Sequence, residues 1–209
     1  MIITDDWTFV HIPRTGGVSL KFAYLNTLTL VKYDDWFVTK LDAQHKLRPA
    51  SFSNLHEDLR NWGSEHASVD YWESLIPENS QLFTIVRNPY DRFQSMCRKA
   101  HDIAQTDEKR TNALNVDYVL GHAGWGSWAA SDTQKSYLDS TTKNITVYKF
   151  ETQLQAAYED HGLTFADQTT GDITNNASQN TTNILTPETI EKINTHYHDD
   201  FVEFGYEKQ

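Results

Sequence analysis

Two apolar stretches that each run directly into a helix-start signal constrain the fold of this chain more than any other feature. Aromatic and β-branched residues alternate over residues 7–12, and Pro13 and a glycine pair follow. Residues 81–86 are almost continuously apolar, as expected of a strand buried on both faces. Asn88 then supplies a helix cap, with Pro89 at the first helical position. Two strand–turn–helix units of this kind favour a parallel sheet.

The rest of the chain continues the alternation. A third strand is predicted over residues 145–150, followed by a helix that ends at Gly162. The last helix is predicted after Pro187, with one apolar stripe formed by Ile190, Ile193, Tyr197, Phe201 and Phe204. Because the chain has 209 residues, we expect one α/β domain over residues 1–209, with a central parallel sheet flanked by helices.

Two stretches interrupt this pattern. Residues 121–133 combine three glycines with Trp125 and Trp128, too glycine-rich for a regular element and too aromatic for a linker. Residues 167–183 are almost wholly polar, which predicts a mobile surface loop, either a lid or a loop without a role.

The charge distribution restricts the classes of partner. The net charge is −11, so we expect neither a nucleic-acid binder nor a protein of anionic membranes. Residues 1–110 carry 13 basic against 15 acidic side chains, whereas residues 111–209 carry 5 against 14. An anion site is therefore expected in the first half.

The compartment is expected to be the cytoplasm. The N-terminus lacks the basic start and apolar core of a signal peptide, and no apolar run is long enough for a membrane span. The single Cys97 forms no internal disulfide and is interpreted as a small core residue.

The loop after the first strand is a candidate anion site. In residues 11–20 a glycine pair joins a strand to a helix, which turns backbone N–H groups and a helix N-terminus toward one point. Arg14 adds charge, and Thr15 and Ser19 add hydroxyl donors. The spacing of a Walker sequence is absent, and a purely structural turn is the alternative.

The second strand–helix unit contributes a cation and a hydroxyl. Arg87 follows the strand at its carboxyl end, where ligands gather in open α/β sheets. Ser95 lies about two helical turns further on, within reach of the same ligand. The alternatives are that Arg87 forms an ion pair with Asp91 and that Ser95 is a helical residue without a binding role.

Together the two segments resemble the sulfotransferase superfamily, in particular the carbohydrate sulfotransferases related to the heparan sulfate 2-O enzymes. That family carries I-P-K-T-G-G-T-S near the N-terminus and V-R-N-P-Y-D-R-F-x-S downstream, matched here by residues 12–19 and 86–95. The likeness continues through residues 134–138, 148–151 and 200–206. It implies a P-loop-NTPase-like sulfotransferase fold and 3′-phosphoadenosine 5′-phosphosulfate (PAPS) as co-substrate.

The resemblance also implies roles, position by position. Arg14 stands where the family has a lysine, and its implied task is to neutralise charge on the departing phosphate. The loop contacts to the 5′-phosphosulfate would come from Thr15, Gly16, Gly17, Val18 and Ser19, largely through backbone N–H groups. Val18 replaces a threonine, so one hydroxyl is missing. Arg87 and Ser95 match the pair that holds the 3′-phosphate.

Sulfuryl transfer to an alcohol also needs a base near the acceptor oxygen. His66, followed by a small residue and Ser68, resembles the histidine of the 2-O branch. Glu65 is the alternative base, His56 a weaker one, and a structural role for His66 a further possibility. We expect no metal site, because the closest histidine pair, His196 and His198, points to different faces of a helix.

The expected function is therefore transfer of a sulfuryl group from PAPS to a hydroxyl-bearing acceptor, a carbohydrate or a small alcohol. The acidic second half disfavours a highly sulfated polymer as acceptor. Two alternatives stay open: a nucleotide-binding protein of the same fold without turnover, and an ATP-dependent phosphotransferase. The sequence leaves the oligomeric state open.

Overall fold

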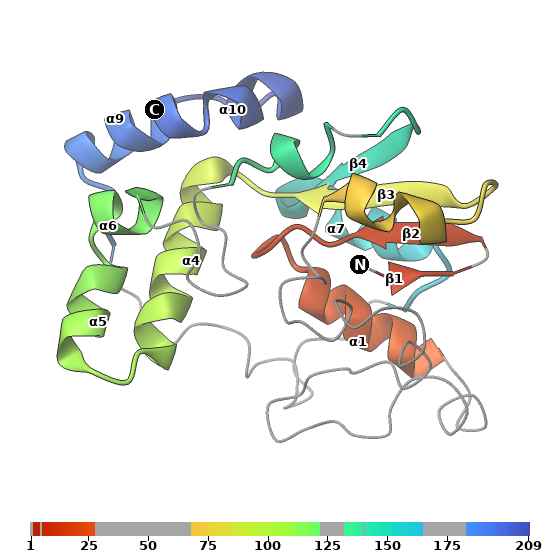
Figure 1. Ribbon diagram of the computed structural model, residues 1–209, viewed down its shortest axis with the longest axis horizontal. Helices are drawn as coiled ribbons and strands as arrows, with labels where there is room; N and C mark the ends of the chain where they lie inside the picture. Colours follow the sequence, from red (N-terminus) through yellow and green to blue (C-terminus); the bar gives the residue numbers. More distant parts are fainter. Residues whose placement is uncertain (1, 5, 28–67, 122–131, 140, 165–182) are drawn as a thin grey trace.

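A four-stranded sheet forms the centre of the protein (Figure 1). Its strands are β1 (Ile2–Ile3), β2 (Trp7–Val10), β3 (Gln81–Val86) and β4 (Ile145–Lys149), in the spatial order β1-β2-β3-β4. The strands β2, β3 and β4 run parallel, and β1 pairs antiparallel with β2 at one edge. This computed structural model describes residues 2–4, 6–27, 68–121, 132–139, 141–164 and 183–209.

The helices alternate with the strands. They are α1 (Gly17–Thr27), α3 (Val69–Trp72), α4 (Pro89–Ile103), α5 (Asp107–Ala113), α6 (Val116–Gly121), α7 (Phe150–Glu159), α9 (Pro187–His196) and α10 (His198–Phe204), with the short 3₁₀ helices η4 (Glu73–Leu75) and η5 (Lys135–Tyr137). In the described part of the chain, none of these helices has both the length and the apolar character that a bilayer span needs.

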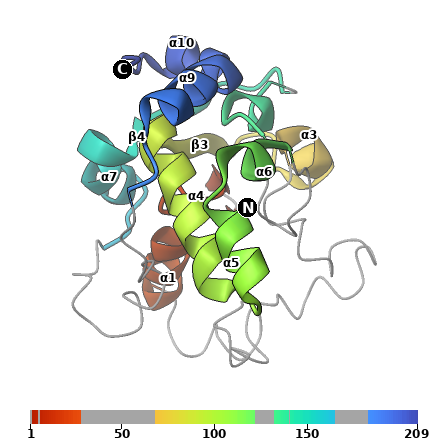
Figure 2. The same cartoon turned by 90° about the vertical axis from the view of Figure 1, so that its left-hand side faces the viewer.

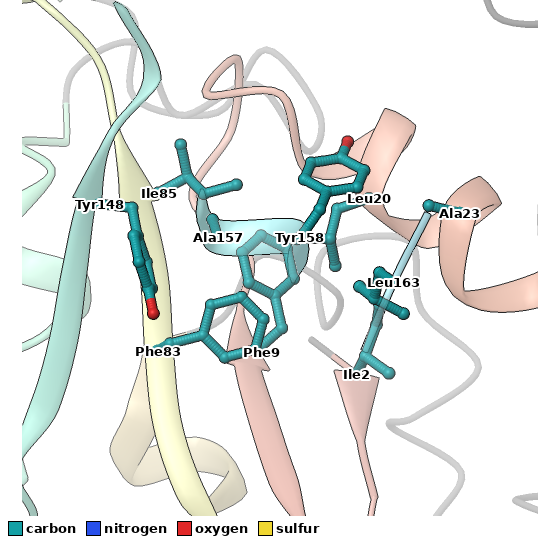
Figure 3. Packing of buried hydrophobic residues seen from close by; sticks show 10 residues of the cluster. All are labelled: Ile2, Phe9, Leu20, Ala23, Phe83, Ile85, Tyr148, Ala157, Tyr158 and Leu163. Carbon is teal, nitrogen blue, oxygen red and sulfur yellow. The ribbon is translucent and has the colours of Figure 1, made fainter. Parts of the chain in front are cut away.

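One face of the sheet packs against α1 and α7 (Figure 3). Phe9 of β2 and Phe83 of β3 point to this face and meet Leu20 from α1 and Tyr158 from α7. On the opposite face, Val10 and Leu82 pack against Val69 of α3 and against Ile76, which follows η4. Figure 2 views the sheet from its end and shows α1 and α7 on one side and α3 on the other. The predicted α/β class, with helices on both faces, is confirmed.

A second core joins the remaining helices beside the sheet, where β3 ends (Figures 1 and 2). Phe93 and Cys97 of α4 pack with Ile193 of α9 and Phe201 of α10. The α9 helix contacts both α4 and α6. Cys97 is fully buried, which confirms it as a core residue, and burial raises the pKa of its thiol to about 12.

The start of α4 confirms the predicted cap. The side chain of Asn88 accepts a hydrogen bond from the N–H of Tyr90 at 3.0 Å, and Pro89 occupies the first helical position. The helix that was predicted to end at Gly162 is α7, which ends earlier, at Glu159; Gly162 follows it with a left-handed φ of 67°.

Strand β2 is shorter than predicted: it ends at Val10 and not at residue 12. Side chains satisfy the backbone carbonyls where a longer strand would use ladder partners. Thr84 Oγ1 donates to the Val10 carbonyl at 2.8 Å, and Thr15 Oγ1 donates to the Ile12 carbonyl at 2.9 Å. The chain therefore leaves the sheet early and enters the loop before α1.

The last helix was predicted as one element and is two. Tyr197, with φ −100° and ψ 28°, separates α9 from α10. The apolar stripe persists, since Ile193, Tyr197, Phe201 and Phe204 are all buried. Ile193, Tyr197 and Phe201 pack in the second core, whereas Phe204 packs with Ile12 and Val86.

His161 gives the fold a dependence on pH. Its ring stacks on Phe83, with centroids 3.6 Å apart, and burial lowers its pKa. The folded protein thus prefers the neutral imidazole, so this stabilisation is complete above the ordinary pKa of 6.5 and is lost as the pH falls through the lowered folded-state value. We expect His161→Phe, which keeps the ring and removes the proton, to lose less free energy of unfolding than the wild type between about pH 8 and about pH 5. Urea denaturation at both pH values measures this; equal losses in both proteins would contradict it.

Candidate functional site

The candidate site lies at the carboxyl ends of the three parallel strands. Because β2, β3 and β4 are adjacent and parallel, the segments that follow them emerge at one edge of the sheet. Arg14 follows β2, Arg87 follows β3 and Phe150 follows β4. The strand pairing thus gathers residues from three separate segments.

Arg14 connects the first segment to the second. Its Nε donates a hydrogen bond to Ser95 Oγ on α4 at 3.0 Å. The Nη1 of Arg87 points to the Arg14 carbonyl oxygen at 3.4 Å. The structure therefore brings together the two arginines and the serine that the sequence predicted as an anion site.

The backbone of Arg14 is strained. Its φ of 66° is left-handed, and Arg14 is the one non-glycine residue with a positive φ in the described part of the chain. A side chain in this conformation costs roughly 1–2 kcal/mol relative to the right-handed region. Such strain persists where the surroundings hold it, often at functional sites.

This strain predicts an inverted order of stability for two truncations. Arg14→Gly and Arg14→Ala both remove the guanidinium, but only glycine relieves the left-handed backbone. We expect the glycine variant to exceed the alanine variant by about 1 kcal/mol in free energy of unfolding, the reverse of the usual order. Urea denaturation of both variants gives the difference, and a more stable alanine variant would show that the left-handed backbone is not maintained in solution.

The two glycines after Arg14 are required by close packing. Gly16 has a φ of 93°, and a Cβ there would lie 2.9 Å from the Phe150 ring. A Cβ on Gly17 would lie 2.1 Å from Cδ2 of the buried His11. Only glycine lets the loop approach β2 and α7 this closely.

The start of α1 supplies backbone donors. The first helical hydrogen bond runs from Leu20 N to Gly16 O at 3.3 Å, so the N–H groups of Gly17, Val18 and Ser19 stand in the open first turn. An anion at this point is favoured by those donors and by the helix dipole. The Thr15 hydroxyl donates to Ile12 O, so its proton serves the loop and not a ligand.

Arg87 is held against the third segment. Its guanidinium lies over the Phe150 ring, 4.7 Å from the centroid. Its buried Nε has no hydrogen-bond partner among the residues that the structure describes. A buried donor of this kind is costly unless a ligand or water accepts from it.

The electrostatics of the site favour an anion. Burial and the charge of Arg87 lower the pKa of Arg14 to about 10, against the opposing effect of Asp102. Burial also lowers the pKa of Arg87, with Asp91 and Glu151 acting in the opposite direction. Arg14 stays charged at neutral pH, so the two cations repel each other across a partly desolvated site.

A third cation was missed by the sequence reasoning. Lys99 lies one turn after Ser95 on α4, and its pKa is lowered by burial and by the charge of Arg14. Lys99 and Ser95 are four residues apart and therefore lie on the same face of α4, so this spacing could have identified Lys99 from the sequence.

Other predicted site residues lie outside the described residues. These are His66, Glu65 and His56, most of residues 121–133 and nearly all of residues 167–183. Their predicted roles as base, acceptor wall and lid stay predictions.

Comparisons with family models, with curated proteins and with solved structures find no match. The chemistry of the site follows from its own residues: two arginines, a lysine, a serine and an open helix N-terminus, set around one edge of the sheet. Such a set of charges and donors suits an anion with more than one negatively charged group.

Proposed function

We propose that this protein is a sulfotransferase that moves a sulfuryl group from PAPS to an acceptor hydroxyl. The observation that carries the proposal is the contact of Arg14 with both Ser95 and Arg87, which joins two anion-binding segments far apart in the sequence. The donor nucleotide has two separate anionic groups, so it suits a site with two adjoining anion-binding segments.

Each segment takes one end of the donor in this proposal. The first turn of α1, with Arg14, binds the 5′-phosphosulfate through backbone N–H groups and the guanidinium. Arg87 and Ser95 bind the 3′-phosphate, with Arg87 Nε as a donor that lacks a described protein partner. We also propose that the parallel sheet, with a strand–loop–helix at this site, is a P-loop-NTPase-like sulfotransferase fold.

The reaction follows from the charges. The acceptor oxygen attacks sulfur, the bond from sulfur to the phosphate oxygen breaks, and the electron pair leaves on 3′-phosphoadenosine 5′-phosphate. Arg14 stabilises the negative charge that develops on this leaving group. The acceptor proton passes to a base, for which His66 is the first candidate and Glu65 the second. The entering and leaving oxygens lie roughly in line.

Titration with 3′-phosphoadenosine 5′-phosphate tests the proposal most directly. We expect saturable binding without magnesium and no comparable binding of ATP, measured by isothermal titration calorimetry. Binding of ATP alone would overturn the proposal and favour the phosphotransferase.

Turnover separates an enzyme from a nucleotide-binding protein of the same fold. PAPS labelled on sulfur, incubated with a panel of glycans and small alcohols, reveals the acceptor by mass spectrometry. A protein that binds the nucleotide but transfers no label to any acceptor in cell extracts would be the non-catalytic alternative. Loss of transfer in Glu65→Gln with full activity in His66→Ala would assign the base to Glu65.

A further inference from the structure

The backbone of Arg87 is held by a side chain from a distant segment. The Arg87 N–H donates to Gln134 Oε1 at 2.8 Å, and Gln134 Nε2 donates to the Arg87 carbonyl at 2.8 Å. The buried amide thus satisfies both polar groups of one residue just beyond the end of β3. These two bonds fix the position and rotation of the backbone unit from which the Arg87 side chain extends.

Gln134 is in turn held by the C-terminal helix. Asp200 of α10 is fully buried and accepts from Gln134 N and from Lys135 N, each at 2.9 Å. Gln134 Nε2 also reaches Asp200 Oδ2 at 3.4 Å. A buried carboxylate that accepts several N–H bonds sets the geometry of the backbone around it.

The same short segment also supports the first anion-binding loop. Arg92 is 1% exposed; its Nε donates to the Pro13 carbonyl at 3.1 Å, and its Nη1 donates to the Asp132 carbonyl at 3.0 Å. Residues 132–135 therefore contact both anion-binding segments. Asp132 binds Arg92, which holds the backbone at Pro13, and Gln134 binds the backbone of Arg87 directly. Neither Gln134 nor Asp200 contacts the guanidinium of Arg87 itself in these hydrogen bonds.

We propose that Gln134, anchored by Asp200, is a positioning residue that sets the preference of the site for a 3′-phosphorylated nucleotide. This inference rests on the proposed function, since it assigns the 3′-phosphate to Arg87. With Gln134 in place, the Arg87 guanidinium lies against Phe150 and presents its Nε in a fixed direction. Without the two backbone bonds, the same charge remains but its direction is no longer fixed.

The test compares two ligands that differ only in the 3′-phosphate. Gln134→Met keeps the length of the side chain and removes both hydrogen bonds to Arg87. We expect the preference for 3′-phosphoadenosine 5′-phosphate over adenosine 5′-phosphate to fall about tenfold, with the affinity for adenosine 5′-phosphate little changed. Isothermal titration calorimetry with both nucleotides gives the ratio directly.

Two further variants make the test independent of overall stability. Asp200→Asn keeps the size of the anchor and loses one of its two charged acceptors, and we expect a smaller fall in the same ratio. Ile193→Val shortens a fully buried core residue outside the network and should leave the ratio unchanged. If Gln134→Met does not fold, the ratio for Asp200→Asn decides.

The outcomes separate the inference from the proposed function. An affinity ratio between the two nucleotides that is unchanged in Gln134→Met would overturn the positioning role and leave the proposed function standing. If Gln134→Met does not fold, an unchanged ratio in Asp200→Asn has the same meaning. Equal losses for both nucleotides would do the same, because they mark a general support of the fold. If the wild-type protein shows no preference for the 3′-phosphate, the proposed function falls and the inference falls with it.

Discussion

Arg87→Ala is expected to weaken the binding of 3′-phosphoadenosine 5′-phosphate by about a hundredfold, roughly 2.7 kcal/mol. The loss is large because the guanidinium is partly buried, stacked on Phe150, and holds a donor without a described protein partner. Adenosine 5′-phosphate lacks the group that Arg87 would bind, so its affinity should change little. Isothermal titration calorimetry with both nucleotides separates these effects.

Two matched variants show whether the charge of Arg87 or the geometry of its guanidinium accounts for this loss of affinity. Arg87→Lys keeps the charge and loses the planar fork, so its affinity should lie between those of wild type and alanine variant. Arg110→Ala removes one cation from the exposed face of α5, where it pairs with Asp107. We expect no loss there, because an exposed charge is screened by salt. Equal losses in the Arg87 and Arg110 alanine variants would contradict the assignment of the 3′-phosphate to Arg87.

Gly17→Ala is expected to lower the free energy of unfolding by about 3 kcal/mol and to abolish nucleotide binding. The new Cβ would lie 2.1 Å from His11 Cδ2 and 2.4 Å from His11 Nε2. The His11 ring is 2% exposed and stacks beside Phe9, so it has no open space to enter. The loop would have to move instead, and with it the donors in the first turn of α1. Urea denaturation and nucleotide titration measure the two effects.

The clash itself can be isolated. In a His11→Ala background the obstructing ring is gone, so Gly17→Ala should cost much less than it does alone; the double-mutant cycle gives this coupling. Gly121→Ala is the control, since a Cβ there meets nothing within 4 Å. An undiminished cost in the His11→Ala background would place the cause in backbone conformation and not in packing.

The three parallel strands and the start of α4 were predictable because their signals are local, whereas the two-residue, antiparallel strand β1 was not predicted. The apolar run of β3 and the Asn88–Pro89 pair each specify one structure over a few residues. The helices α5 and α6 were not predicted. They are short, and α6 has no fully buried residue, so neither carries the apolar periodicity on which the prediction depends.

Most members of the candidate site were predictable, with Lys99 the exception, but their contacts were not. Arg14, Arg87 and Ser95 stood out through their motifs, but the bond from Arg14 to Ser95 joins residues 81 positions apart. The pairing of β2 with β3 brings them together. Gln134 carries no local signal for its proposed role, because that role depends on hydrogen bonds to a backbone unit 47 positions away.

The burial of Cys97 has a practical consequence for probing this protein. It is the single thiol of the chain; its raised pKa keeps it protonated, and its burial shields it from reagents. A cysteine introduced at an exposed position, such as Val202 on α10, would be the one site that a maleimide dye modifies rapidly. The native sequence thus already provides the background for fluorescence or spin-label distance measurements on the helix that anchors Gln134.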